Sequence, residues 1–508
     1  MPASAIVDIS RDEVIQSRQQ RRQNHRARRY EAFEKMSHNP WVLGMIFVHC
    51  LPGDGFARPN RTNAPLHLTH VCRYWRQIAR TTPELWSGIR LKSRIFNVDT
   101  ALMHTEILDH WLTLSKACSF SFHITYTQIF SPEILNAPFG FVYPIISKLT
   151  ECAHRWRNIN IGGHSVFVFS MLRCLAAPLK ELESITIDLP GDRISSSRSV
   201  ILFPPPFRID TANMPKLRRF YSRSETLRFV WTGIPPRLET LSQVSRGLSL
   251  DDSFSFNLGV LRRLTLIGTV ISCMTLLTIS RAAPSLRSLH ITVTGSTGFS
   301  DVGVHDLISF PDLRHLRLED WEGPASVLLD KLHTPSLMSL HFATHSDNIN
   351  PNPCLLQLAA LIQRSMSPLR VLKIFAGGCR EEDLLSVLRV VPEVLIELTV
   401  LEVSMTDSTL QTLTRSQAPT ETCICLCPYL RSLTLRCQNP FRMYSASELI
   451  KSRMGGVADV NVENISKFQP LQHCSLMVDN ADLLADDPDI HRYIEEGRLK
   501  LIHNIWDL

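Results

Sequence analysis

A short leucine pattern, L-x-x-L-x-L, recurs through this chain and strongly limits what it can fold into. Close copies are "LRRLTL", "LRSLHI", "LRHLRL", "LMSLHF", "LRVLKI" and "LRSLTL", which begin at Leu261, Leu286, Leu313, Leu337, Leu369 and Leu430. Weaker copies begin at Leu179, Leu217, Leu238 and Leu395. The last two apolar positions of each copy are two residues apart, so in a strand they point to the same side of a sheet. The pattern therefore predicts a series of strands that face one core.

The residues between the copies predict helices. Successive copies from Leu261 begin 25, 27, 24, 32, 26 and 35 residues apart, with the weaker copy at Leu395 counted. Residues 273–283, 354–365 and 381–391 have the apolar spacing of helices. A proline that ends a helix and allows an extended segment to begin precedes most copies: Pro178, Pro215, Pro236, Pro284, Pro311, Pro335, Pro368 and Pro428. Because no single cycle can bury its own apolar face, neighbouring cycles must stack.

This arrangement resembles a leucine-rich-repeat solenoid. The resemblance implies an α/β fold, with a horseshoe of repeats over residues 93–508. The Asn or Cys that usually follows the strand in such repeats is missing from most copies, so we expect an irregular solenoid with uneven curvature. Helix-then-strand patterns at residues 101–126, 141–161 and 445–502 extend the array at both ends. The insert Pro190–Arg208 breaks the spacing and is predicted to be a loop.

Residues 39–91 have no leucine pattern and predict helices at about 42–50 and 66–80, joined by a polar loop. This segment resembles the F-box of large fungal F-box proteins, of the basidiomycete type. The leucine that precedes the proline in that family falls at His38 here, and its acidic residue falls at Trp41. Trp41 either adds apolar area at a docking surface or packs into the domain. The matching residues are Pro40, Val42, Leu43, Ile46, Phe47, "CLP" from Cys50, Leu68, Val71, Cys72, Trp75, Arg76, Ile78, Ala79 and "PELW" from Pro83.

The resemblance implies a substrate-recognition subunit of a Skp–cullin–F-box ubiquitin ligase, which is not itself an enzyme. It divides the chain into a basic N-terminal segment (1–36), a small all-helical F-box (37–92) and the repeats (93–508). The F-box would bind a Skp-type adaptor, and through it the cullin, while the repeats would bind a target protein. The adaptor-binding residues implied are Pro40, Val42, Leu43, Ile46, Phe47, Leu68, Val71, Cys72 and Trp75.

A physical argument supports a partner for this segment independently. A unit of about fifty residues buries too little surface to be very stable alone. Its apolar residues fall at helical spacings that create a face suited to a partner helix or groove. Trp86 is expected to be a core anchor that joins this segment to the first repeats. Trp75 could be either a core anchor or part of the face.

The predicted strands also place a polar stripe on the side of the sheet opposite the core, because alternate residues face opposite sides. Its members are Arg263, Thr265, Ser288, His290, His315, Arg317, Ser339, His341 and Lys373. Arg263, His290, His315, Arg317, His341 and Lys373 are the candidate target-binding residues, because arginine and histidine donors suit acidic or phosphorylated segments. The alternative is a solvated sheet face that binds nothing.

Charge and hydropathy bound the remaining possibilities. The net charge is +6, and Arg11–Lys35 holds eight Lys/Arg against four Asp/Glu. This segment predicts a solvated helix or a disordered tail, with a nuclear-import signal in "RRQNHRARR" as an alternative. A nucleic-acid contact is the weaker expectation, since the rest of the sequence has no nucleic-acid-binding motif. The chain has no apolar run long enough for a membrane span and no secretory signal, so we expect it in the cytoplasm, the nucleus or both.

Motifs that carry chemistry are missing from the sequence. It contains no glycine-rich phosphate loop, no G-x-S-x-G and no H-E-x-x-H. Cys423, Cys425 and Cys427 alternate along an extended segment without completing a zinc set, so buried reduced cysteines are expected. His67 and His70 are expected to be a surface pair. We therefore expect no metal and no cofactor. The alternative function is an F-box-like repeat scaffold in the nucleus that has lost its adaptor.

Overall fold

The computed structural model describes a chain that divides into two compact units, Met1–Leu182 and Glu183–Leu508. The described residues are 39–129, 142–189, 207–224, 227, 229–231, 235–244, 258–268, 273–293, 307–320, 325–344, 354–414, 426–437, 439–455 and 469–502. The predicted basic segment 1–36, most of the predicted loop Pro190–Arg208, and Cys423 and Cys425 lie outside these residues. Among the described helices, none combines the length and the hydrophobicity that crossing a bilayer requires.

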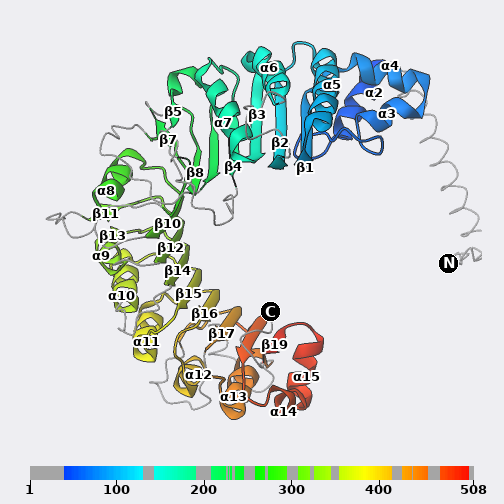
Figure 1. Cartoon of the computed structure of the whole chain (residues 1–508). Coiled ribbons are helices and arrows are strands. Elements are labelled where there is room, and N and C mark those ends of the chain that lie inside the picture. The colour runs from blue at the N-terminus through cyan, green and yellow to red at the C-terminus, as the bar shows by residue number, and fades with distance from the viewer. Residues whose placement is uncertain are drawn as a thin grey trace, which may run out of the picture. The chain divides into compact units, whose positions relative to one another are not determined.

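The first unit begins with short helices and continues as strands that alternate with helices (Figure 1). Its elements are α2 (Pro40–His49), α3 (Leu66–Val71), α4 (Arg73–Thr81), η1 (Pro83–Trp86), β1 (Gly88–Phe96), α5 (Val98–Ser115), β2 (Phe120–Ile129), α6 (Tyr143–Glu151), η2 (Ala153–Arg155), β3 (Trp156–Gly163), α7 (Ser165–Arg173) and η3 (Cys174–Ala176).

The core of the first unit is aromatic. Strands β1, β2 and β3 pair in parallel, and alternate residues of β2 from Phe120 to Tyr126 are fully buried, as strand periodicity requires. The ring centroids of Trp86 and Trp111 are 5.0 Å apart at 75°, an edge-to-face geometry favoured by aromatic pairs. Trp86 is 1% exposed, and its Nε1 donates to the carbonyl of Ala79 at 2.8 Å. The prediction that Trp86 is a core anchor is confirmed.

The second unit contains the remaining strands, each usually followed by a helix or a short turn. Its strands are β4 (Ser184–Leu189), β5 (Phe207–Ile209), β6 (Arg219–Ser224), β7 (Phe229–Trp231), β8 (Thr240–Val244), β9 (Arg263–Ile267), β10 (Ser288–Val293), β11 (Ile308–Ser309), β12 (His315–Asp320), β13 (Leu332–His333), β14 (Ser339–Thr344), β15 (Val371–Ala376), β16 (Glu397–Leu401), β17 (Ser432–Arg436), β18 (His473–Met477) and β19 (Leu499–Ile502). Its helical elements are η4 (Thr211–Asn213), α8 (Cys273–Ala282), α9 (Ala325–Lys331), α10 (Cys354–Ser365), α11 (Glu381–Val390), α12 (Asp407–Leu413), α13 (Met443–Met454), α14 (Ala481–Ala485) and α15 (Pro488–Glu495).

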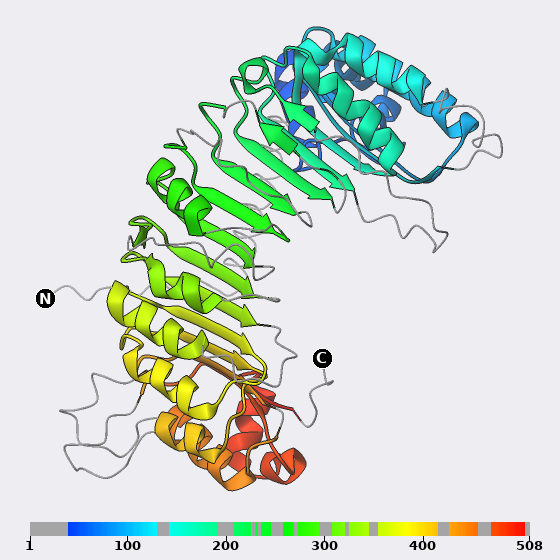
Figure 2. The same ribbon diagram turned by 60° about the vertical axis from the view of Figure 1, so that its left-hand side comes forward.

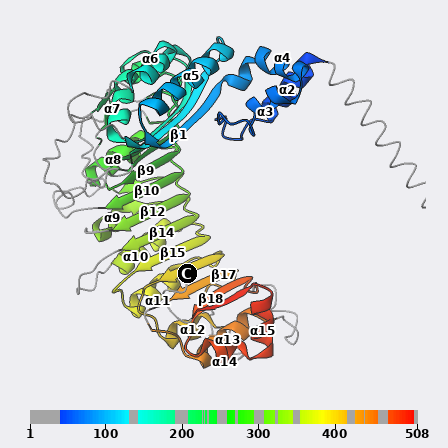
Figure 3. The same cartoon turned by 45° about the vertical axis from the view of Figure 1, so that its right-hand side comes forward.

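The leucine pattern gives the strands of the second unit their positions. Each close copy begins two residues before a strand, so its last two apolar residues lie in the strand. In β9 these are Leu264 and Leu266, exposed by 2% and 1%. The strands run side by side in one direction (Figure 2), and α8, α9, α10 and α11 lie along one side of β9–β15 (Figure 3). The predicted strands and the helices near residues 273, 354 and 381 are confirmed.

The fold class predicted from the sequence is corrected by the sheet itself. The described strands form a 15-stranded, all-parallel sheet in the order β1-β2-β3-β4-β6-β8-β9-β10-β12-β14-β15-β16-β17-β18-β19, alternating with helices. The protein is therefore an α/β protein built on this sheet, not a small all-helical F-box followed by a leucine-rich-repeat solenoid. Strand β1 begins at Gly88, inside the segment 37–92 that was predicted to be all-helical.

The physical reason is that the leucine pattern specifies which strand residues face inward, and nothing about how strands are grouped. Strands β1 and β2 have no copy of the pattern, yet alternation alone buries Ile89 and Leu91 in β1 and Phe122 in β2. They pair in parallel like the patterned strands. A boundary drawn where the pattern begins therefore separates segments that belong to the same sheet.

Candidate docking surfaces

Helix α2 is fixed at its start by a side-chain cap. The Oδ1 of Asn39 accepts hydrogen bonds from the backbone N–H groups of Trp41 at 3.1 Å and Val42 at 3.4 Å. Pro40 occupies the first turn, where its missing N–H is tolerated. The helix is apolar on several sides, so it buries one face and still exposes large apolar residues on another.

The single helix predicted over residues 66–80 is two helices. Cys72 is extended (φ −156°, ψ 172°), so α3 ends at Val71 and α4 begins at Arg73. The Sγ of Cys72 accepts a hydrogen bond from the N–H of Trp75 at 3.4 Å and caps the second helix. The prediction that Val71, Cys72 and Trp75 lie at the spacing of one continuous helical face is therefore wrong, because the break at Cys72 changes the direction of the side chains beyond it.

Three of the predicted adaptor-binding residues lie inside the chain's own core. Leu43, Phe47 and Leu68 are only 3%, 1% and 5% exposed. The rings of Phe47 and Trp75 are 4.8 Å apart, and Trp75 is half-buried beside it. Leu43, Phe47 and Leu68 hold the helices together and expose too little surface to contact a partner, which corrects their predicted role. They were named because the F-box resemblance implies them, and a sequence pattern does not show which of its apolar residues the chain itself covers.

The remaining apolar residues of α2–α4 form what we call the helical apolar surface: Trp41, Met45, Ile46, Val71 and Tyr74. Their exposed fractions are 73%, 47%, 39%, 50% and 40%. Helices α2, α3 and α4 lie together (Figure 3), and the surface comes from all of them. Among the predicted contact residues, Pro40 and Cys72 are also exposed, and Val42 is half-buried. The sequence prediction missed Met45, although it lies one helical turn after Trp41.

The polar residues around this surface carry positive charge. Residues 66–81 contain no Asp or Glu. His67, His70, Arg73, Arg76 and Arg80 are exposed there, as expected for the histidine pair. The Nε of Arg76 donates to the carbonyl of Thr69 at 2.8 Å and braces α3 against α4. A partner for this surface would combine apolar area with acidic residues at its edge.

The predicted polar stripe is brought together by the register of the sheet. His290 of β10 pairs with Arg317 of β12, Arg317 with His341 of β14, and His341 with Lys373 of β15. A second row, nearer the strand starts, contains Arg263 beside Ser288 and then His315. Arg263, His315 and Arg317 are exposed, whereas His290, His341 and Lys373 are half-buried.

Two carboxylates that the prediction overlooked pair with the basic side chains of the stripe. Glu319 Oε1 is 3.1 Å from His290 Nε2 and accepts from Arg317 Nε at 2.7 Å. The hydrogen bond from His290, with the smaller effect of Arg317, lowers the pKa of Glu319 to about 2 against the opposing effect of burial. Lys373 Nζ lies 2.7 Å from Glu397 Oε1. Burial lowers the pKa of His341, with a smaller effect from Arg317. The positive charge of the stripe is therefore largely compensated by these two carboxylates. The sequence could have indicated this, because Glu319 is two residues after Arg317 and so lies on the same face of the strand.

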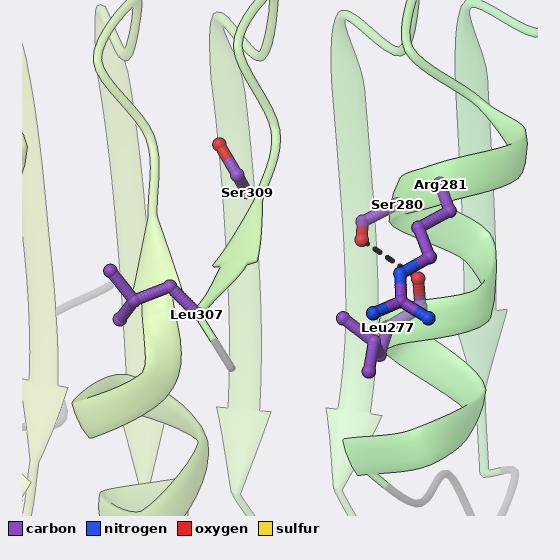
Figure 4. Close-up of a pocket in the computed structure, with 5 residues that line it drawn as sticks. All are labelled: Leu277, Ser280, Arg281, Leu307 and Ser309. Carbon is purple, nitrogen blue, oxygen red and sulfur yellow. Dashed lines mark hydrogen bonds between the residues drawn. The ribbon is translucent and has the colours of Figure 1, made fainter. Parts of the chain in front are cut away.

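Two hollows also lie on the described surface. One, of about 350 Å³, is lined by Leu277, Ser280, Arg281, Leu307 and Ser309 (Figure 4), and the Oγ of Ser280 donates to the carbonyl of Leu277 at 2.8 Å. The other, of about 360 Å³, is lined by Cys50, Pro52, Phe56, Arg58, Asn63, Ala64 and Arg90, and Arg90 is ion-paired with Asp54. In the described residues neither lining itself contains a His, Asp, Glu or Lys that could act as a base, but the Oγ of Ser309 lies 3.3 Å from Nδ1 of His333, which is not among the lining residues.

In the part of the chain that the structure describes, no three His, Cys, Asp or Glu residues gather as a metal site would require. Cys427 is buried, as predicted, and the described cysteines are free thiols. No family model matches this chain, and the search of curated proteins finds no match.

Proposed function

We propose that this protein is a receptor subunit of a Skp–cullin–F-box ubiquitin ligase, active in the cytoplasm, the nucleus or both. The helical apolar surface binds the Skp-type adaptor and, through it, the cullin. The polar face of the sheet binds a target protein. In this role the chain positions proteins and performs no chemistry of its own.

The observation that carries this proposal is the exposure of Trp41, Met45 and Ile46 along α2. A soluble surface seldom gathers large apolar side chains without a partner to cover them. Trp41 falls where the F-box pattern has an acidic residue, so its exposure adds apolar area at the position that the resemblance assigns to the adaptor. The basic residues of α3 and α4 then suit an adaptor whose docking site is acidic at its edge.

The buried residues support the same proposal indirectly. Leu43 and Phe47 pack inward and Trp75 lies against Phe47, so the exposed residues of α2 are held on a helix with a fixed orientation. A preorganised apolar surface binds more tightly than a mobile one because less conformational entropy is lost on association.

The test is capture of the full-length chain on an immobilised Skp-type adaptor. The double variant Trp41→Asp/Ile46→Asp places two charges in the centre of the surface, and its apparent Kd should rise by about thirtyfold or more, as loss of an interface hot spot would cause. The matched control is Leu356→Asp/Leu483→Asp, which changes apolar residues of similar exposure, 46% and 62%, in the second unit. Circular dichroism checks that both variants fold.

Two outcomes would contradict the proposal. If the unaltered chain is not captured, the alternative of a scaffold without a ligase role becomes the better explanation. If the Trp41→Asp/Ile46→Asp chain is captured as well as its control, the adaptor binds elsewhere on the protein.

A further inference from the structure

A row of arginines crosses the sheet where its strands begin. The residue immediately before β9, β10, β12 and β15 is arginine in each case: Arg262, Arg287, Arg314 and Arg370. Before β14 the equivalent residue is Met338. We call the four arginines the arginine row. They occupy the second position of the leucine pattern and were not among the residues selected from the sequence.

Backbone hydrogen bonds place these residues side by side. The N–H of Arg287 donates to the carbonyl of Arg262, and that of Arg314 donates to Arg287, both at 2.9 Å. The N–H of Met338 donates to Arg314 at 2.9 Å, and that of Arg370 donates to Met338 at 2.8 Å. Neighbouring members of the row are therefore one strand spacing apart, about 4.8 Å, with one gap of twice that distance.

The arginine row differs from the polar stripe in being uncompensated. All four arginines are exposed, and within the described residues none of them forms an ion pair. By contrast, Arg317 and Lys373 of the stripe are paired with Glu319 and Glu397. Exposed Arg263 and His315, the first residues of β9 and β12, add further donors beside the row.

We propose that the arginine row binds an extended acidic segment of a protein, running across the strand starts from β9 to β15. Resting on the proposed function, this segment belongs to the target. Carboxylates and phosphoserines share the chemistry that a guanidinium recognises, two oxygens that accept a forked pair of hydrogen bonds. Among the described residues none of the four arginines is ion-paired, and Glu239, which lies beside Arg262 in the same backbone ladder, is paired with Arg218 instead. At the stripe an acidic ligand would have to displace Glu319 or Glu397.

A protein segment fits this surface better than a nucleic acid does. Single-stranded nucleic acids are usually held by aromatic side chains on which the bases stack. Among the described residues 258–376, the large exposed apolar side chains are Val260, Met274, Leu307, Leu356 and Met366, and none is aromatic. Within the described residues, the row thus provides charge and hydrogen-bond donors without an exposed Phe, Tyr or Trp on which bases could stack.

The test measures fluorescence anisotropy of labelled probes with the full-length chain. A peptide of about twelve residues with alternating Glu and Ser would cross the whole row at about 3.3 Å per residue. Its phosphoserine form, its Gln/Ser form and a thymidine oligonucleotide of the same length are the other probes. Arg287→Gln/Arg314→Gln should weaken binding of the acidic peptides by about tenfold, because two exposed ion pairs are lost. The better of the Glu and phosphoserine forms identifies the source of the acidic groups.

The matched control removes the same charge elsewhere. Arg380→Gln/Arg389→Gln changes two exposed arginines at α11, and the affinity should change by less than about twofold. The inference is overturned if both double variants bind alike, if the unaltered chain binds the acidic peptides no better than the Gln/Ser peptide, or if the oligonucleotide binds more tightly than both acidic peptides. Adaptor capture of Arg287→Gln/Arg314→Gln is measured in parallel, so a failure here is distinguishable from failure of the proposed function.

Discussion

The α2–α4 helices and the β9–β15 strands differ in how much of their apolar surface is exposed to solvent. In β12 the apolar residues Leu316 and Leu318 are buried and the outward positions are polar. In α2, Leu43 and Phe47 are buried, whereas Trp41 and Ile46 are exposed. A parallel sheet covered by helices can bury every leucine of its pattern. A short helix with apolar residues all round it buries only the side that meets a neighbour. The difference indicates where the protein needs a partner.

The largest effect expected from this comparison is in the sheet. Leu318→Ala removes a fully buried side chain from β12 and should lower the free energy of unfolding by about 2–5 kcal/mol, because a cavity remains in a packed core. Urea denaturation monitored by circular dichroism measures it. The control Leu483→Ala changes a leucine that is 62% exposed, and its free energy of unfolding should lie within about 0.5 kcal/mol of that of the unaltered chain. If both variants lose the same free energy of unfolding, then burial of Leu318 in the sheet does not contribute the stability expected of it.

A somewhat smaller effect should separate two residues within α2. Leu43→Ala should lower the free energy of unfolding by about 2–4 kcal/mol, and Trp41→Ala by less than about 0.5 kcal/mol, since only Leu43 is buried. Thermal unfolding of both variants with and without adaptor gives the measurement. Should Trp41→Ala destabilise the isolated chain as much as Leu43→Ala, then Trp41 packs against the chain itself and the helical apolar surface is not free.

The smallest effect concerns the charges of the sheet and depends on pH. The pKa of Glu319 is about 2 in the folded chain, below its ordinary 4.5, so the ionised group stabilises the fold. That contribution is complete above about pH 4.5 and is lost as the pH falls toward 2. Glu319→Gln should therefore be less stable than the unaltered chain at pH 7, and the gap should narrow on acidification to pH 3. A gap that stays constant between these pH values would mean that Glu319 is not held by His290 and Arg317.

The strands could be predicted because their signal is local. Leu264 and Leu266 are two residues apart, and that spacing alone places both on one face of β9. Helix α10 was predicted with the same ends, Cys354 and Ser365, because its apolar periodicity stops where the chain approaches Pro368. The break at Cys72 could not be predicted, since the pattern on both sides is helical and only the cap formed by the thiol interrupts it.

The candidate sites were predicted less well because they depend on neighbours that are distant in sequence. Arg317 and Lys373 were correctly placed on one face of the sheet, on strands separated by β14, but the carboxylate that pairs with Lys373 belongs to β16. Leu43 and Phe47 were assigned to a docking face because periodicity cannot distinguish a face covered by α4 from one left open. The arginine row went unnoticed because each arginine precedes its strand, and no rule of alternation applies there.

The sequence by itself determined which residues of each strand face inward, where most helices begin and end, and that the chain carries strongly basic surfaces. These properties follow from periodicity and composition, which are local. Only the tertiary structure decided that the strands share one parallel sheet, which apolar residues of α2 stay exposed, and which arginines form no ion pair with the other described residues. Those outcomes depend on contacts between residues that are far apart in the sequence. The spacing of side chains within one segment carries no information about such contacts.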